Sequence, residues 1–286
     1  MRVGFVGLGD QGGPIASRIH GGGFPLTLWA RRGRSLEPFA GTDVEIAAGP
    51  ADLGRRSDVV GVCLFDAAGV REVLLGPGGV VEGMRPGGIV LVHTTLSPDE
   101  VRDIAAEVTA AGLSLLDAPV SGGNARAVEG TLTVMVGGDR QALDQVRPVL
   151  ATYATDVVHL GGIGAGQTAK LLNNALFTAQ LVLADDVLRI GEVLGLDPGS
   201  LARVLGTSSS AGTASRVRFD VGSLAGLAAS LADAALSKDV GLLGQAMAGR
   251  PREDVLAVAE RFVAAMEDAR GAGAPEDAGG RAVDRR

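Results

Sequence analysis

Residues 3–12 read VGFVGLGDQG and give the clearest indication of the fold of this chain. The first four of these residues are apolar, with one glycine among them, and they indicate a short buried strand. Gly7, Gly9 and Gly12 follow in the spacing G-x-G-x-x-G, directly before a helical pattern. In such a unit the first glycine allows the tight turn, the second lets the backbone approach a pyrophosphate, and the third lets helix and strand pack closely. The stretch predicts a dinucleotide-binding loop, with an ordinary glycine-rich turn as the alternative; the expected cofactor contacts are Gly7, Leu8, Gly9, Asp10, Gln11 and Gly12.

Outward from this loop, short β-branched runs alternate with helical patterns as far as about residue 160. The alternation is typical of a parallel sheet covered by helices on both faces. The strand candidates are 3–6, 26–30, 44–47, 58–64, 88–93, 113–117, 132–137 and 157–160. The helix candidates between them are 12–20, 67–75, 98–111 and 140–151.

The character of the chain changes after residue 161, where the strand pattern stops and proline is absent from 164 to 197. This stretch predicts one long helix, on the order of 50 Å, that leaves the first domain and begins a second. Further helical patterns lie at 198–205, 223–248 and 252–268. We therefore expect an α/β fold, with a Rossmann-type doubly wound parallel sheet in residues 1–162 and an all-helical second domain in 163–270. Residues 271–286 are Gly, Ala, Pro and charged residues, and we expect a disordered tail there.

Composition excludes several classes of protein. With 33 acidic and 26 basic residues the net charge is −7, so nucleic acid is not an expected partner. The most apolar helical stretch, 171–196, carries four charged residues, so no membrane span is expected. The chain has a single cysteine, which cannot form a disulfide within the chain. It has three histidines, and no two of them stand at the spacing of metal ligands, so no metal site is expected. Because the apolar run at the amino terminus is also too short for a signal-peptide core, we expect a reducing, cytoplasmic location.

The end of the second strand candidate bears on the choice of cofactor. NAD-binding proteins usually place an acidic residue there for the ribose 2′-hydroxyl, whereas this chain has Arg31 and Arg32. Guanidinium groups attract a 2′-phosphate and bind it through a planar fork. The sequence therefore favours NADP, with NAD as the other cofactor to consider and a solvated basic pair as the alternative role of these arginines.

Lysine is rare in this chain. Arginine supplies all but two of the 26 basic residues, and the exceptions are Lys170 and Lys238. Lysine can lose its proton when it is buried, whereas arginine stays charged. A lysine in a chain that otherwise uses arginine is therefore a candidate acid or base. The alternative is that the two lysines occur by chance. Lys170 and Asn174 are four residues apart in the long helical pattern and so share a face.

With these residues in view, the chain resembles the β-hydroxyacid dehydrogenase family, the group of 3-hydroxyisobutyrate dehydrogenases and tartronate semialdehyde reductases. The likeness extends from residue 3 to about 248 and rests on four motifs in the family's order. They are GFVGLG at 4–9 followed by Gly12, DAPVSGG at 117–123 with GTL at 130–132, GQTAK at 166–170 with Asn174, and the pair Lys238-Asp239.

The resemblance implies a role for each matching residue. Lys170 would be the general acid/base, and Asn174 would contact the substrate. The substrate carboxylate would be held by Ser121, Gly122 and Gly123. Further cofactor contacts would come from Leu64, Phe65 and Thr95, and near the nicotinamide from Lys238, which Asp239 would orient.

Some features depart from the family pattern and keep the substrate open. Gln11 stands where the family commonly has methionine, and Asn124 follows the double glycine where a small apolar residue is common. The resemblance, taken together with Arg31 and Arg32, implies an NADP-preferring oxidoreductase that acts on a short β-hydroxyacid or semialdehyde. The alternatives are a reductase of a non-acid carbonyl or imine on the same fold, and a catalytically silent NADP-binding interaction module. We also expect a homodimer or homotetramer, because the second domain has more apolar helices than a small domain can bury.

Overall fold

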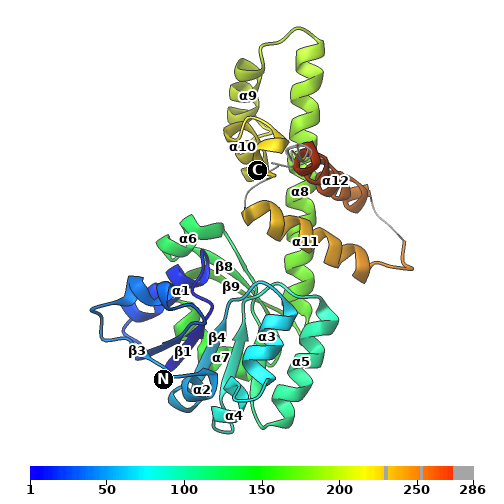
Figure 1. The fold of residues 1–286 in the computed structure, drawn as a ribbon. Coiled ribbons are helices and arrows are strands. Elements are labelled where there is room, and N and C mark those ends of the chain that lie inside the picture. The colour runs from blue at the N-terminus through cyan, green and yellow to red at the C-terminus, as the bar shows by residue number, and fades with distance from the viewer. Residues whose placement is uncertain (229–230, 252–253, 273–286) are drawn as a thin grey trace, which may run out of the picture. The chain divides into compact units, whose positions relative to one another are not determined.

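The computed structural model describes residues 1–228, 231–251 and 254–272 (Figure 1). The chain divides into two compact units, Met1–Asn173 and Asn174–Arg286. The division falls within helix α8 (Ala165–Val193), which therefore contributes residues to both units. The domain limits at 162 and 270 that the sequence suggests stay predictions.

The first unit is built on one nine-stranded sheet in the order β3-β2-β1-β4-β5-β6-β8-β7, with β9 paired to β8. Strands β1 to β6 are parallel, and in the register Val3 lies opposite Leu26 on one side and Val59 on the other. The strands are β1 (Val3–Val6), β2 (Leu26–Trp29), β3 (Glu45–Ile46), β4 (Val59–Val62), β5 (Ile89–Val92), β6 (Ser114–Asp117), β7 (Val120–Ser121), β8 (Leu132–Gly137) and β9 (Ala154–Gly161). The Rossmann-type α/β prediction is confirmed.

One edge of the sheet differs from the parallel arrangement that we predicted. Strand β8 is antiparallel to both β6 and β7, whereas β9 is parallel to β8. Strand β7, a two-residue strand that the sequence did not reveal, continues in the direction of β6, and the chain reverses through residues 122–131 before it enters β8. The sheet is therefore mixed.

Helices cover both faces of this sheet, because the strands are apolar on both sides. Phe5 and Leu91 point into the core with α1 (Gly12–Gly21) and α7 (Arg140–Leu150). Val6 and Val90 point into the opposite core, with α2 (Pro50–Arg56), α3 (Ala67–Leu75) and α5 (Pro98–Ala110). Fully burying such a side chain contributes about 1.5–3 kcal/mol. The remaining helices of the unit are η1 (Gly33–Phe39), α4 (Val80–Gly83) and α6 (Gly123–Glu129).

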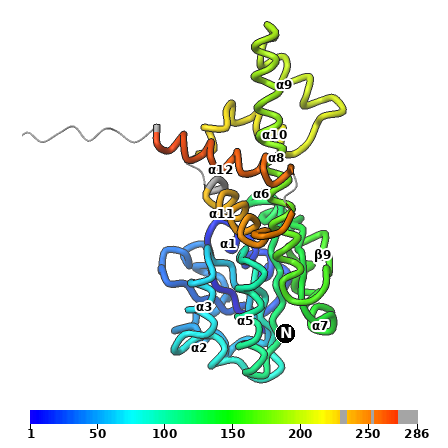
Figure 2. The backbone as a smooth tube through the Cα atoms, turned by 90° about the vertical axis from the view of Figure 1, so that its right-hand side faces the viewer, coloured from blue at the N-terminus to red at the C-terminus, as the bar shows by residue number. Residues whose placement is uncertain are grey.

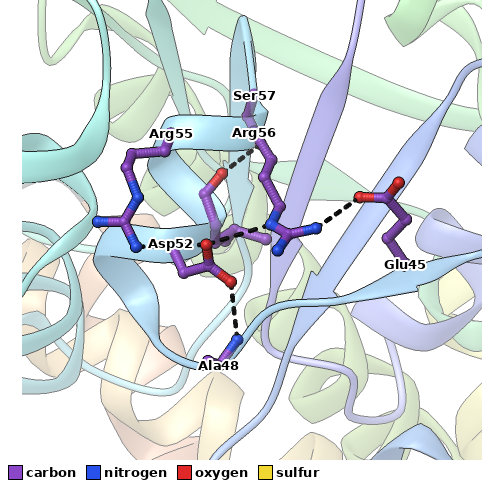
Figure 3. Close-up of polar contacts among 7 residues, drawn as sticks. Glu45, Ala48, Asp52, Arg55, Arg56 and Ser57 are labelled. Atoms are coloured by element: carbon purple, nitrogen blue, oxygen red, sulfur yellow. Dashed lines mark hydrogen bonds and ion pairs between the residues drawn. The ribbon is translucent and has the colours of Figure 1, made fainter.

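A polar network joins α2 to the neighbouring strand β3 (Figure 3). The Asp52 carboxylate accepts hydrogen bonds from the Ala48 backbone N–H at 3.0 Å and from Arg56 Nε at 3.2 Å. Arg56 also donates to Glu45 at 3.0 Å. The Ala48 N–H, followed by Arg56, lowers the pKa of Asp52. Such exposed pairs contribute little to stability, so the network fixes the path of the chain between β3 and α2 more than it stabilises the sheet.

The second unit is helical (Figure 2). Besides its part of α8 it contains α9 (Pro198–Thr207), α10 (Thr213–Asp220), η2 (Leu224–Leu227), α11 (Leu231–Ala246) and α12 (Asp254–Ala272). A small core that includes Leu181, Phe262 and Met266 holds it together. In place of the single helical pattern at 223–248 there are two elements, η2 and α11, and α10 was not expected. The tail expected at 271–286 lies outside the described residues, except that its first two residues end α12.

The described residues contain neither a membrane-spanning helix nor a cluster of metal ligands. None of the helices there is long and apolar enough to cross a membrane. The same part of the chain contains no group of three or more His, Cys, Asp or Glu residues that could hold a metal ion.

Candidate active site

The glycine loop between β1 and α1 has the geometry that its spacing predicts. Gly7 has φ +91°, and a Cβ there would overlap the carbonyl group of Cys63. A Cβ at Gly12 would overlap the Gly7 carbonyl oxygen, so this glycine allows α1 to begin directly against the turn. Gly9 has open space where a Cβ would be. The loop therefore packs closely against the protein at Gly7 and Gly12 and leaves space for a ligand at Gly9.

This loop lines a cavity of about 550 Å³ at the carboxyl ends of β1, β2 and β4. The volume suits a small-molecule or cofactor site, and the carboxyl ends of parallel strands are where such ligands bind. Helix α1 begins here, and its N-cap residue Gln11 makes no side-chain cap. An uncapped N-terminus leaves N–H groups that can bind a pyrophosphate. The cavity thus fits a dinucleotide, and its lining includes Gly7, Leu8, Gly9, Asp10, Gln11, Gly12, Arg31, Arg32, Leu64 and Phe65.

Both arginines after β2 line this cavity, but they differ in their contacts. Arg31 Nη2 lies 2.7 Å from Glu72 Oε2 of α3, and both side chains are about two-thirds exposed. Arg32 is exposed. The ion pair to Glu72 was not foreseen, because α3 follows β2 by about forty residues.

The loops after β4 and β5 are joined to each other beside this cavity. The Leu64 backbone N–H donates to Thr94 Oγ1 at 2.8 Å. Phe65 is 60% exposed and is one of the residues that line the cavity. Thr95 is partly exposed in the loop after β5.

The first turn of α8 is anchored to the sheet by two buried side chains. Asp117, at the end of β6, accepts hydrogen bonds from the backbone N–H groups of Gly164 and Gln167, both at 2.8 Å. Gln167 donates through Nε2 to the Thr94 carbonyl at 2.8 Å and accepts from the Leu96 N–H at 3.0 Å. Burial raises the pKa of Asp117, although these N–H donors act in the opposite direction. Helix α8 is thereby fixed to the loop that carries Thr95.

Lys170 lies one turn beyond this anchor and is partly exposed. The approach of α8 to the sheet is close, because a Cβ at Gly166 would overlap the Met135 carbonyl oxygen. Asn174 follows Lys170 by one further turn of the same helix. The lysine therefore stands on a helix whose start has little freedom to move.

In the second unit, the side chains of Asn174 and Lys238 both lie close to the carboxylate of Asp239. Asn174 Nδ2 donates to Asp239 Oδ2 at 2.6 Å, and Asp239 is 2% exposed. Lys238 Nζ lies 3.7 Å from Asp239 Oδ1. Asp239, which we expected to orient Lys238, therefore also holds the carboxamide of Asn174.

The loop Ser121–Gly123 leads from β7 into α6. Gly122 and Gly123 have φ of +130° and +69°, which other residues adopt only with strain. Asn124 Nδ2 donates to the Asp10 carbonyl at 2.6 Å. This hydrogen bond places the expected substrate loop beside the glycine loop.

His93 and Cys63 carry side chains that are capable of acid–base or nucleophilic chemistry, and burial shifts the pKa of both. His93 is buried, with Nδ1 2.7 Å from the Ala118 carbonyl oxygen and Nε2 3.3 Å from the Tyr153 hydroxyl. Burial lowers the pKa of His93 to about 4, so its ring is neutral near pH 7. Burial also raises the pKa of the Cys63 thiol to about 12. Neither residue has the properties of an acid or nucleophile at neutral pH.

Asp117 and Gln167 had no predicted role beyond their place in the motifs, and the hydrogen bond from Asn124 to Asp10 was not predicted. A buried carboxylate at a strand end and a glutamine inside an apolar helix start are the signals that could have identified the first two. The third joins residues 114 positions apart, which no local pattern reveals.

Comparisons with known proteins identify relatives of this chain. A family model described as the NAD binding domain of 6-phosphogluconate dehydrogenase matches residues 2–161, and one described as NAD-binding of NADP-dependent 3-hydroxyisobutyrate dehydrogenase matches residues 164–279. An uncharacterised oxidoreductase of Shewanella frigidimarina is 36% identical over 200 residues, which are 68% of each chain. Human mitochondrial 3-hydroxyisobutyrate dehydrogenase is 32% identical over 207 residues, 72% of this chain and 62% of that one. The structure of Mycobacterium tuberculosis 3-hydroxyisobutyrate dehydrogenase with L-serine has a TM-score of 0.81 and 27% identity and covers 94% of both chains.

Proposed function

The chain belongs to the β-hydroxyacid dehydrogenase family, and we propose that it transfers a hydride between NADP and a short β-hydroxyacid or the corresponding semialdehyde. Membership of this family makes it an NAD(P)-dependent oxidoreductase. The observation that carries the finer proposal is the anchored start of α8, where Asp117 and Gln167 fix the helix that bears Lys170. A proton donor must be held in place to act in the transition state, and this helix can hold one.

In the proposed mechanism the bound nicotinamide supplies or accepts the hydride. Lys170 gives a proton to the substrate oxygen when the carbonyl is reduced, and takes one back when the hydroxyl is oxidised. Ser121, Gly122 and Gly123 bind the substrate carboxylate through a loop of small residues whose backbone N–H groups can converge on an anion. Asn174, held by Asp239, orients the substrate.

We propose the cofactor contacts as follows. The loop Gly7–Gly12 and the start of α1 bind the pyrophosphate, with Leu64, Phe65 and Thr95 beside the rest of the dinucleotide. Lys238 contacts the cofactor near the nicotinamide. Arg31 and Arg32 bind the 2′-phosphate of NADP. To do so, Arg31 leaves its exposed ion pair with Glu72 and pairs with the phosphate instead. NAD is the alternative cofactor.

The substrate class follows from the proposed carboxylate loop. A short β-hydroxyacid has a carboxylate for residues 121–123 and a hydroxyl for Lys170, and the relative solved with L-serine carries such a molecule. Residues 208–236 are rich in Ala, Gly and Ser, and this unusual composition of the expected pocket segment makes a non-acid carbonyl or imine the second candidate. A third candidate is an NADP-binding module without turnover.

One assay separates the three candidates. The consumption of NADPH is measured with short semialdehydes, with neutral aldehydes and ketones of the same length, and with cyclic imines. Turnover of the semialdehydes at the highest kcat/KM is the expected result. Preference for the neutral carbonyls or the imines would favour the second candidate, and NADPH binding without any turnover would favour the third.

The predicted cytoplasmic location and the homodimer or homotetramer are also part of this proposal. The proposed location rests on the single cysteine, which cannot form a disulfide within the chain. Self-association is supported by apolar side chains on α8, where Leu176, Leu183 and Ile190 are 52%, 50% and 58% exposed. They are spaced by seven residues and so lie along one face of the helix.

A further inference from the structure

Helices α1 and α6 pack against each other, and each begins at one of the two loops of the proposed site. Helix α1 follows the glycine loop, and α6 follows the substrate loop Ser121–Gly123. Beyond their first residues the two helices are in close contact. Ile15 and Ala127 belong to the same core, and the guanidinium group of Arg18 lies against Gly130. The two loops are therefore carried by one packed pair of helices.

Beside the starts of these helices the packing is open. A cavity of about 450 Å³ lies there, and its lining includes Asp10 of the glycine loop, Pro14 of α1, and Asn124 and Val128 of α6. Groups on opposite walls of a cavity make no van der Waals contact, so such a gap transmits a displacement of one loop to the other poorly. A hydrogen bond joins the two walls, because Asn124 Nδ2 donates to the Asp10 carbonyl oxygen at 2.6 Å.

Both partners of this hydrogen bond stand next to glycines. Gly122 and Gly123, which have positive φ, precede Asn124, and Gly9 precedes Asp10. Fixing the backbone of glycine costs more conformational entropy than fixing that of any other residue. Because the hydrogen bond ties the two loops together, a ligand that orders one of them lowers the entropy cost of ordering the other.

The acceptor connects this hydrogen bond to the cofactor side of the site. It is a backbone carbonyl, and the same planar peptide group carries the Gln11 N–H at the start of α1. In the proposed function the pyrophosphate binds at this start. A ligand oxygen that accepts from the Gln11 N–H polarises the peptide group and makes the Asp10 carbonyl a stronger acceptor for Asn124.

We propose that Asn124 is a positioning residue that couples cofactor binding to substrate binding. A dinucleotide on the glycine loop orders the substrate loop through the hydrogen bond from Asn124 to Asp10, and the substrate carboxylate then binds more tightly. This inference rests on the proposed function. The family commonly has a small apolar residue at this position, which has no side-chain donor, so the coupling is a property of this chain.

The coupling is measured with a cofactor fragment that lacks the nicotinamide and so cannot touch the substrate through it. The fragment is 2′-phospho-ADP-ribose, which keeps the pyrophosphate, and the second ligand is 3-hydroxypropionate, a short β-hydroxyacid. The wild type should bind 3-hydroxypropionate about three- to tenfold more tightly when the fragment is present. By linkage, 3-hydroxypropionate should strengthen binding of the fragment by the same factor. Adenosine 2′,5′-bisphosphate, which has no pyrophosphate, should give no such increase.

Substitution of Asn124 tests its part in this coupling. Asn124→Leu keeps the branched shape but has no donor, so the ratio of the two affinities should fall to about one. Val128→Ala, one turn further along α6 at a residue that is 57% exposed, is the matched control and should keep the wild-type ratio. A merely structural role for Asn124 predicts a different result, in which Asn124→Leu unfolds at a lower temperature and binds 3-hydroxypropionate more weakly with and without the fragment, at an unchanged ratio.

Hydrogen exchange tests the same connection without any substrate. NADPH should slow the exchange of backbone amides in the glycine loop of both the wild type and Asn124→Leu. In residues 124–129, the exchange should become slower in the wild type only. Equal protection of these residues in the two proteins would show that α6 is ordered without Asn124.

Failure of this inference can be told from failure of the proposed function. An equal affinity ratio in the wild type and Asn124→Leu would overturn the role of Asn124, and so would a wild-type ratio of one. Neither result affects a wild type that reduces semialdehydes with NADPH. A wild type that binds NADPH but not 3-hydroxypropionate would count against the proposed substrate class, and hydrogen exchange would then decide on Asn124. A wild type that binds neither NADPH nor NADH would refute the proposed function itself.

Discussion

Lys170 is the residue on which the proposed proton transfer depends. Lys170→Arg keeps the positive charge but removes the group that can lose a proton. We expect this variant to fold, to bind NADPH, and to lose at least about two orders of magnitude in kcat, since general acid–base catalysis contributes about 10²–10⁴-fold. Lys238→Arg is the control and should show a smaller loss, through cofactor positioning. Near-full turnover by Lys170→Arg would remove Lys170 from the mechanism.

Arg31 determines the cofactor preference in the proposal, and its pair with Glu72 adds a control. Arg31→Asp should raise the KM for NADPH about tenfold or more while the KM for NADH changes little, because only NADPH has the 2′-phosphate. Glu72→Gln removes the competing carboxylate 2.7 Å from Arg31 and should not raise the KM for NADPH. If Arg31→Asp raises the KM for NADPH and the KM for NADH equally, Arg31 does not bind the 2′-phosphate.

His93 predicts a pH dependence of stability. Burial lowers its pKa from the usual 6.5 to about 4, so the unfolded chain takes up this proton at a higher pH than the folded protein does. Its contribution to stability is therefore fully present above pH 6.5 and is lost as the pH falls towards 4, by up to about 1.4 kcal/mol per pH unit. Urea unfolding of the wild type and of His93→Gln across this range should show a steeper loss for the wild type. Parallel curves would contradict the assignment.

At the scale of elements, the anchor between the first turn of α8 and the loop after β5 has a measurable energy. Gln167→Leu leaves the Thr94 carbonyl and the Leu96 N–H buried without their partner, so we expect a loss of about 2–4 kcal/mol of unfolding free energy. Turnover should fall as well, because Lys170 is one turn away. Gln180→Leu, at an exposed glutamine of the same helix, should change stability by less than about 0.5 kcal/mol. If the two substitutions lower the free energy of unfolding equally, the hydrogen bonds of Gln167 do not stabilise the protein.

The elements also show what a sequence can reveal. The strands β1, β4 and β5 were predicted because their apolar runs are buried on both faces. Strand β7 and helix α6 were missed, since two residues have no periodicity and α6 begins at glycines with positive φ. The candidate site residues came from glycine spacing, the rarity of lysine and the family motifs. The hydrogen bonds that hold them, such as Asp117 to Gly164 across 47 positions, are long-range and have no local signal.

For the whole molecule, the exposed apolar face of α8 predicts self-association. A charge within that face should oppose burial against a second copy, so Leu183→Glu should lower the molar mass measured by sedimentation at micromolar concentration. Ile46→Glu places the same charge at an exposed apolar residue of β3 and should leave the mass unchanged. A wild-type protein that sediments as a monomer would contradict this prediction directly.

The scarcity of lysine has a practical consequence for the study of this protein. The primary amines of the chain are those of Lys170, Lys238 and the amino terminus. Mild reductive methylation with isotope-labelled formaldehyde would therefore place NMR-visible methyl groups on the proposed acid, on the proposed nicotinamide contact and at one reference position. Because dimethyl-lysine keeps its charge and can still titrate, these signals would report cofactor binding and protonation without a single mutation.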